Sequence, residues 1–164
     1  MAAPATAHLR YNVDTNVLID LAKGIPVAQR LLAKLRLNNC AVGICPTVIQ
    51  ELTYLALDEK GDPGKYALIA LQNLRHWGVF PYDLSGCGHG ITDQAANKII
   101  GAGLLPEAEY HDGLIIAETA LVDIPTLISG DIHMLEINPA KLVSILTEND
   151  LYPISIYSPR QMLP

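Results

Sequence analysis

The sequence predicts a single α/β domain over residues 1–164, with a mostly parallel central sheet between helices in three layers. Short apolar runs typical of buried strands alternate with longer segments of helical periodicity. Two of these runs end in an aspartate, Asp14 and Asp131. The length of 164 residues suits one domain. Hydrophobic residues make up 50% of the chain and charged residues 17%, which is enough for a buried core and leaves apolar residues for contact with a partner.

Strands are expected where compact apolar runs meet turn residues, at 9–13, 40–45, 79–84, 126–129 and 152–157. Helices are expected where apolar residues recur every three or four positions, at 15–21, 27–37, 47–58, 66–77, 91–102 and 109–122. Residues 60–64 are predicted to form a turn, and the glycine-rich segment 85–90 a loop. No internal repeat or linker interrupts this order.

Asp14 and Asp131 each follow a predicted strand directly, and each precedes a segment of helical character. In parallel α/β sheets the working site lies at the carboxyl ends of the strands. We therefore expect both carboxylates at that edge. The competing interpretation is that each aspartate simply caps the helix that follows it.

Glu51 and Asp112 lie on helices, on faces that also carry apolar residues. Val48, Leu52 and Leu55 place Glu51 within or beside the apolar stripe of its helix, and Ile116 lies one turn after Asp112. Buried carboxylates are costly unless they are paired or bind a metal. The helix dipole, which favours an acid in the first turn, is the alternative explanation for Asp112.

Four acids at one end of one sheet would repel each other unless cations lay between them. Carboxylate oxygens are preferred by Mg²⁺ and Mn²⁺, whereas zinc favours His and Cys. Ions held in this way can activate water and stabilise phosphodiester displacement. The net charge of −6 opposes phosphate binding, but bound cations would cancel it locally.

Four segments carry a family resemblance: VDTNVLIDL at 13–21, PTVIQEL at 46–52, YHDGLIIAETA at 110–120 and LISGDIHML at 127–135. Together they resemble PIN-domain ribonucleases, especially VapC-type toxins of toxin-antitoxin pairs. The resemblance implies a catalytic, metal-binding tetrad of Asp14, Glu51, Asp112 and Asp131, supported by Asn16 and Ser129. It also implies Mg²⁺ or Mn²⁺ as cofactor, an RNA substrate, a homodimer, and an antitoxin protein that blocks the acidic groove.

Two segments depart from this family pattern. Residues 85–89, SGCGH, form an insertion where a short link between strand and helix is expected. The segment 58–77 is longer than the corresponding segment expected in the smallest toxins of this type.

Other candidate residues are better explained structurally. His111 and His133 flank the acids without a zinc-binding spacing, and Cys87 with His89 supplies only two ligands. Arg30, Lys34 and Arg36 could face RNA, although a solvated helix edge is the simpler explanation. These residues give no separate site.

The three cysteines, an odd number without a CxxC pair, favour a reducing compartment. The first nine residues lack the basic and apolar regions of a signal peptide, and no stretch is long and apolar enough to span a membrane. A cytoplasmic protein is expected.

Two alternatives remain open. A haloacid-dehalogenase-like phosphatase also begins with an aspartate after its first strand, but its second aspartate would fall at Asn16, and its lysine has no counterpart. A catalytically silent PIN-like module that binds RNA or protein is the other alternative, because a fold does not fix a function.

Overall fold

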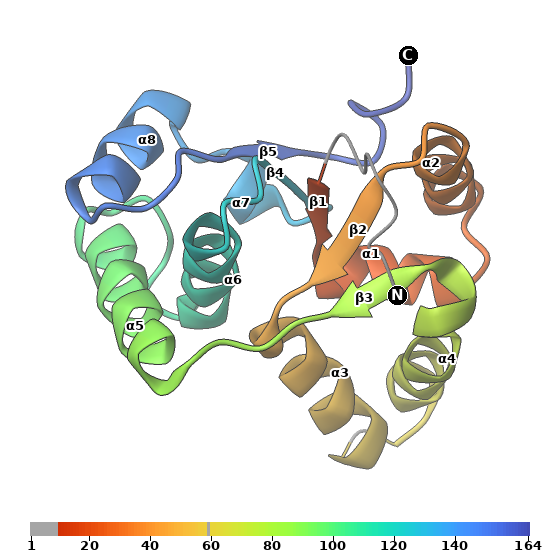
Figure 1. Ribbon diagram of the computed structural model, residues 1–164. Coiled ribbons are helices and arrows are strands. Elements are labelled where there is room, and N and C mark those ends of the chain that lie inside the picture. The colour runs from red at the N-terminus through yellow and green to blue at the C-terminus, as the bar shows by residue number, and fades with distance from the viewer. Residues whose placement is uncertain (1–9, 59) are drawn as a thin grey trace.

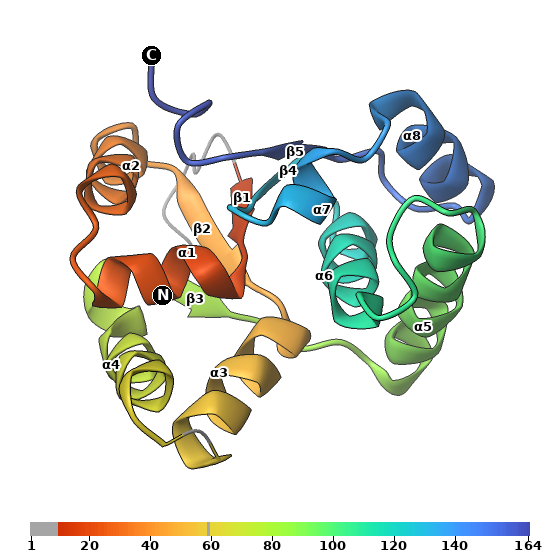
Figure 2. The same ribbon diagram turned by 180° about the vertical axis from the view of Figure 1, so that it is seen from behind.

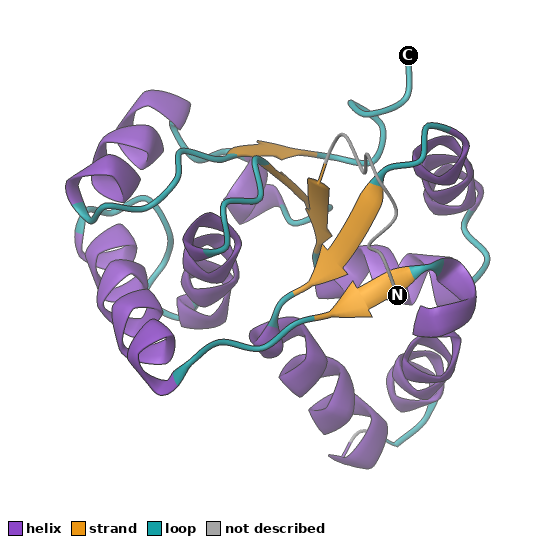
Figure 3. Cartoon of the chain, viewed as in Figure 1, coloured by secondary structure: helices purple, strands orange, loops and turns teal. Residues whose placement is uncertain are grey.

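Five parallel strands form the central sheet, in the order β3-β2-β1-β4-β5 (Figures 1 and 3). The structure is a computed structural model and describes residues 10–58 and 60–164. The strands are β1 (Arg10–Val13), β2 (Ala41–Ile44), β3 (Val79–Pro81), β4 (Thr126–Ile128) and β5 (Ser155–Tyr157). The predicted start of the first strand at Leu9 lies outside the described residues. The sheet is wholly parallel, so the α/β prediction is confirmed.

Two groups of helices cover the two faces of the sheet (Figures 1 and 2). One group contains α1 (Thr15–Ala22), α2 (Pro26–Leu37), α3 (Pro46–Asp58) and α4 (Asp62–Trp77). The other contains α5 (Gly86–Gly101), α6 (Tyr110–Leu121), α7 (Ile132–Leu135) and α8 (Pro139–Glu148). This division follows from right-handed crossovers, because the chain moves outward from β1 to β3 and then returns to β4 and β5.

The core lies where the central strands meet both helical layers. Ile44, Leu127 and Ile128 on the strands are completely buried, as are Leu18 and Ile116 on the helices. Strands buried on both faces are apolar nearly throughout, which is why these short runs were recognisable.

The predicted loop over residues 85–90 is wrong, because α5 already begins at Gly86. Ser85 caps the helix by accepting a hydrogen bond of 3.1 Å from the backbone N–H of Gly88. A Cβ on Gly88 would lie 3.2 Å from the side chain of Leu121. This glycine therefore permits close packing of α5 on α6 and does not mark a turn.

Several boundaries also differ from prediction. Helix α4 begins at Asp62, so the predicted turn at 60–64 is too long; β3 ends at Pro81, and β5 begins only at Ser155. Helices α7 and α8 were not predicted. Within residues 10–58 and 60–164, no helix is both long and apolar enough to cross a membrane.

Candidate functional site

Asp14 is a buried carboxylate at the carboxyl end of β1. Its residue is only 3% exposed, and its backbone N–H donates to the carbonyl of Ile128 at 3.0 Å, continuing the pairing of β1 with β4. One carboxylate oxygen accepts the N–H of Thr15 at 2.7 Å, so Asp14 caps α1. The capping interpretation and the strand-end placement are therefore both correct.

Ser129 and Asn16 hold the second oxygen of Asp14. The Ser129 hydroxyl donates to Oδ2 at 2.6 Å and the Asn16 amide at 2.8 Å. The Asn16 carbonyl oxygen accepts the N–H of Gly130 at 2.8 Å, and the Asp131 N–H donates to Ser129 Oγ at 3.0 Å. This network fixes the ends of β1 and β4 relative to each other.

Glu51 lies on the second turn of α3 and is half-buried. One of its carboxylate oxygens accepts a hydrogen bond from the Thr15 hydroxyl, and the other lies 3.4 Å from Nδ1 of His111. Glu51 thus joins α3 to the first turns of α1 and α6. The prediction that it turns inward is confirmed, although 23% of its side chain stays exposed.

Asp112 lies in the first turn of α6 and carries a buried oxygen without a partner. Oδ2 makes no hydrogen bond within the described residues. Burial raises the pKa of Asp112 to about 8, and the charges of Asp14, Asp131, Glu109 and Glu51 add to this shift. The carboxyl group therefore lacks a compensating positive charge.

Asp131 caps the short helix α7, because its Oδ1 accepts the N–H of His133 at 2.7 Å. Its charge nevertheless acts on the other acids. Burial raises the pKa of Asp14 to about 6, and the charges of Glu51 and Asp131 also raise it, while the hydrogen bonds from Ser129 and Thr15 lower it. All four predicted acids therefore converge on one edge of the sheet.

The acids fit a divalent cation by donor chemistry, but their oxygens are not arranged around a common point. Among residues 10–58 and 60–164, no group of three or more acidic, His or Cys side chains is placed to hold a metal ion. Protein donors bind the oxygens of Asp14, Glu51 and Asp131 instead. Among these four acids, only Asp112 has a buried oxygen without a hydrogen-bond partner in the described residues. A cation would have to draw the other carboxylates towards Asp112.

Glu118 is a buried carboxylate that the sequence analysis did not single out. It is 2% exposed, and its two oxygens accept the N–H of Thr47 at 3.1 Å and the Thr47 hydroxyl at 2.9 Å. Glu118 therefore anchors the start of α3, the helix that carries Glu51. The available signal was an acid inside the apolar stretch 114–121 of α6.

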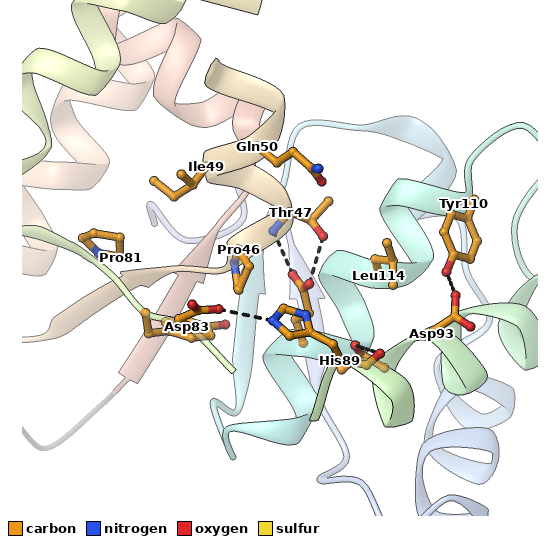
Figure 4. A pocket seen from close by; sticks show the side chains of 13 residues that line it. Pro46, Thr47, Ile49, Gln50, Pro81, Asp83, His89, Asp93, Tyr110 and Leu114 are labelled. Atoms are coloured by element: carbon orange, nitrogen blue, oxygen red, sulfur yellow. Dashed lines mark hydrogen bonds and ion pairs between the residues drawn. The ribbon is translucent and has the colours of Figure 1, made fainter. Parts of the chain in front are cut away.

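A cleft of about 710 Å³ lies between α3 and the starts of α5 and α6 (Figure 4), and the four acids do not line it. His89 Nε2 lies 3.3 Å from Asp83 Oδ1, and Tyr110 donates a hydrogen bond to Asp93. Three carboxylates, those of Asp83, Asp93 and Glu118, are thus among the lining residues of this cleft. Cys40, Cys45 and Cys87 are free thiols, so the SGCGH segment contributes His89 to the cleft and no disulfide.

The basic residues of α2 do not form an RNA-facing edge near the acids. Lys34 donates to the carbonyl of Met162 at 2.7 Å, and Arg36 to that of His76 at 2.7 Å. Both lie in the last turns of α2, just before β2 begins, and so at the opposite end of the sheet from Asp14. They tie neighbouring segments to α2.

Comparisons with known proteins identify solved structures that share this fold. No family model matches the sequence, and no curated protein matches it. A chain of VapBC2 from Rickettsia felis bound to promoter DNA matches with a TM-score of 0.64 and 17% identity, over 92% of this chain and 98% of that one. A chain of FitAcB from Neisseria gonorrhoeae matches with a TM-score of 0.53 and 18% identity, over 92% of this chain and 98% of that one. A chain of FitAB bound to an IR36 DNA fragment matches with a TM-score of 0.55 and 17% identity, over 91% of this chain and 94% of that one.

At these identities the similarity shows a common fold and extends along nearly the whole length of both chains. The five-stranded parallel sheet with helices on both faces is therefore PIN-like.

Proposed function

We propose that this protein is a metal-dependent endoribonuclease whose active site consists of Asp14, Glu51, Asp112 and Asp131. The observation that carries the proposal is the buried, unpartnered Oδ2 of Asp112. Burial raises the pKa of this group to about 8, and four nearby carboxylates, those of Asp14, Asp131, Glu109 and Glu51, add to the shift. A divalent cation would relieve this repulsion, and carboxylate oxygens suit Mg²⁺ or Mn²⁺.

The bound ion would supply Lewis acidity and an activated water for phosphodiester hydrolysis. In this proposal, Asp112 and Asp14 hold the ion from α6 and β1. Glu51 and Asp131 add further negative charge around the ion. Ser129 and Asn16 orient Asp14, because both donate to its Oδ2, and the bond from Ser129 lowers the Asp14 pKa. No nucleophilic side chain is required.

We further propose that the chain acts as the toxin of a toxin-antitoxin pair and works in the cytoplasm as a homodimer. The sequence motifs resemble VapC-type toxins, and a VapBC2 complex shares the fold. The antitoxin would block the acidic groove. The exposed carboxylates of Asp83 and Asp93 favour a partner segment that carries Arg or Lys.

RNA cleavage by the purified protein tests the activity. Total and structured RNA are incubated with wild type, Asp14→Asn and Asp112→Asn in Mg²⁺, Mn²⁺ or chelator. Glu148→Gln, an exposed substitution on α8, is the matched control. We expect cleavage by wild type and control only, and only with metal. Equal cleavage by all four proteins, or activity that survives chelation, would contradict the mechanism. RNA binding without cleavage would favour the silent module instead.

A separate experiment addresses the toxin role. Expression of wild type in a bacterial host should arrest growth, whereas expression of Asp112→Asn at the same level should not. Normal growth with an active wild-type enzyme would separate the ribonuclease activity from the toxin role.

A further inference from the structure

A second pocket, of about 480 Å³, opens directly beside Glu51. It lies between α3 and the first turn of α6 and is lined by Gln50, Glu51, Tyr54, Leu55 and His111. Its volume falls within the range of about 300–1,000 Å³ that is usual for small-ligand sites. Since Glu51 belongs to both the pocket and the acid cluster, any ligand in the pocket adjoins the acids.

The lining combines aromatic faces with an unengaged amide. Tyr54 is 62% exposed, and the His111 side chain is 58% exposed. The Gln50 amide forms no hydrogen bond with another described residue. Leu55 adds an apolar contact. Aromatic faces that stack on bases, next to a side chain that can both donate and accept, are the elements that recognise unpaired bases in RNA.

The lining disfavours a phosphate. Glu51 is an acid, and the pocket contains no Lys or Arg. The larger cleft beyond Gln50 presents Asp83, Asp93 and Glu118, which would also repel the RNA backbone. The tyrosine-lined pocket is therefore suited to the uncharged part of a nucleotide.

We propose that this pocket binds one unpaired nucleobase of the RNA substrate, from a nucleotide that adjoins the phosphate held at the acids. This inference rests on the proposed ribonuclease function. Tyr54 stacks on the base, His111 bounds it from α6, and Gln50 forms hydrogen bonds with its edge. The donor and acceptor of an amide can pair with the edge of an unpaired base, so the pocket suits a base of any of the four kinds.

Another possible occupant of this face is a second copy of the chain. Leu57, 78% exposed on the same helix as Tyr54, would suit a dimer interface. The free amide of Gln50 favours a base instead, since it would be buried without a partner against an apolar face, and the charge of Glu51 at the pocket wall would lose water there.

RNA affinity tests the proposal in the Asp112→Asn background, which prevents cleavage. The ligands are a short single-stranded RNA of mixed sequence and a matching ribose-phosphate chain without bases. Tyr54→Ala is expected to raise the Kd for RNA about 5- to 150-fold and to leave the Kd for the abasic chain unchanged. Tyr54→Phe keeps the aromatic face and should bind RNA like the protein with Tyr54, whereas Gln50→Ala should raise the Kd for RNA and leave the Kd for the abasic chain unchanged.

Tyr152→Ala is the matched control, because Tyr152 is an exposed tyrosine that precedes β5 and so lies at the opposite end of the sheet. An unchanged RNA affinity in Tyr54→Ala would overturn the proposal, as would an equal loss on both ligands. A shift in oligomeric state by sedimentation, with RNA affinity unchanged, would assign Tyr54 to a dimer interface.

The base pocket and the ribonuclease function can fail separately. Metal-dependent cleavage with no effect of Tyr54→Ala on affinity overturns the base pocket alone. Affinity that depends on Tyr54 in a protein that never cleaves RNA overturns the ribonuclease alone. A protein that neither binds nor cleaves RNA overturns both.

Discussion

Ser129, which follows β4, donates a hydrogen bond of 2.6 Å to Oδ2 of Asp14, which follows β1. The two residues are 115 positions apart and meet because β1 and β4 pair at the centre of the sheet. This contact opposes the effect of burial on the Asp14 pKa. It therefore connects the topology of the sheet to the ionisation of a proposed metal ligand.

Ser129→Ala removes this donor from a buried carboxylate. We expect the free energy of unfolding to fall by about 1–3 kcal/mol, because the oxygen loses its hydrogen bond in a place without water. The Asp14 pKa should rise above about 6, and Mn²⁺ affinity should fall. Urea unfolding and Mn²⁺ titration measure these effects. Ser155→Ala, at an exposed position on β5, is the control, and equal behaviour of the two variants would show that the contact has no energetic role.

Asp112→Asn should remove RNA cleavage without loss of stability. The asparagine amide is similar in size to the carboxyl group and carries no charge. The substitution therefore removes a repulsive charge from the acid cluster, and no cation is needed to balance it. We expect an unchanged or higher Tm in chelator, measured by thermal melting beside Glu148→Gln. A large drop in Tm would mean that Asp112 serves mainly the fold.

Glu118→Gln should weaken the anchor of α3. The charged acceptor of two hydrogen bonds from Thr47 is lost, which should cost about 1–3 kcal/mol of unfolding free energy. Thr47→Val removes only the hydroxyl bond and should have a smaller effect. Urea unfolding compares the two variants. If Thr47→Val is the more destabilising, the carboxylate is not the main anchor.

Without metal, the stability of the protein should fall as pH rises from about 4 to about 8. The pKa values of Asp14 and Asp112 are about 6 and about 8 in the folded protein, above their ordinary value of 3.8. In this window the folded state retains protons that the unfolded state has released, so raising the pH favours unfolding. Above about pH 8 both states are deprotonated at these groups, and their contribution levels off.

Urea unfolding in chelator at about pH 5 and about pH 9 tests this linkage by comparing wild type with Asp112→Asn. The variant lacks one of the two carboxyl groups whose pKa is raised, so its free energy of unfolding should fall less between the two pH values. Parallel losses would show that Asp112 is not abnormally protonated. Saturating Mn²⁺ should reverse the trend in wild type, because metal and protons compete for the same oxygens.

The sequence allowed prediction of the alternating strands and helices and of the inward orientation of Glu51 and Asp112. These features depend on local periodicity, which a single sequence displays. The contact of Ser129 with Asp14 depends on strand order, which local patterns do not contain. The start of α5 was missed because glycine normally marks a turn, whereas Gly88 serves close packing. The role of Glu118 was missed because its partner, Thr47, lies on another helix, and a contact between helices is not visible in local patterns.

Mn²⁺ binding, measured by calorimetry beside an RNA cleavage assay on the same preparations, tests the central claim most directly. The account predicts that wild type and Glu148→Gln bind Mn²⁺ and cleave RNA. Asp14→Asn and Asp112→Asn should bind the ion more weakly and lose cleavage. Equal Mn²⁺ affinity in all four proteins, or cleavage that persists in chelator, would contradict a metal site built from these acids.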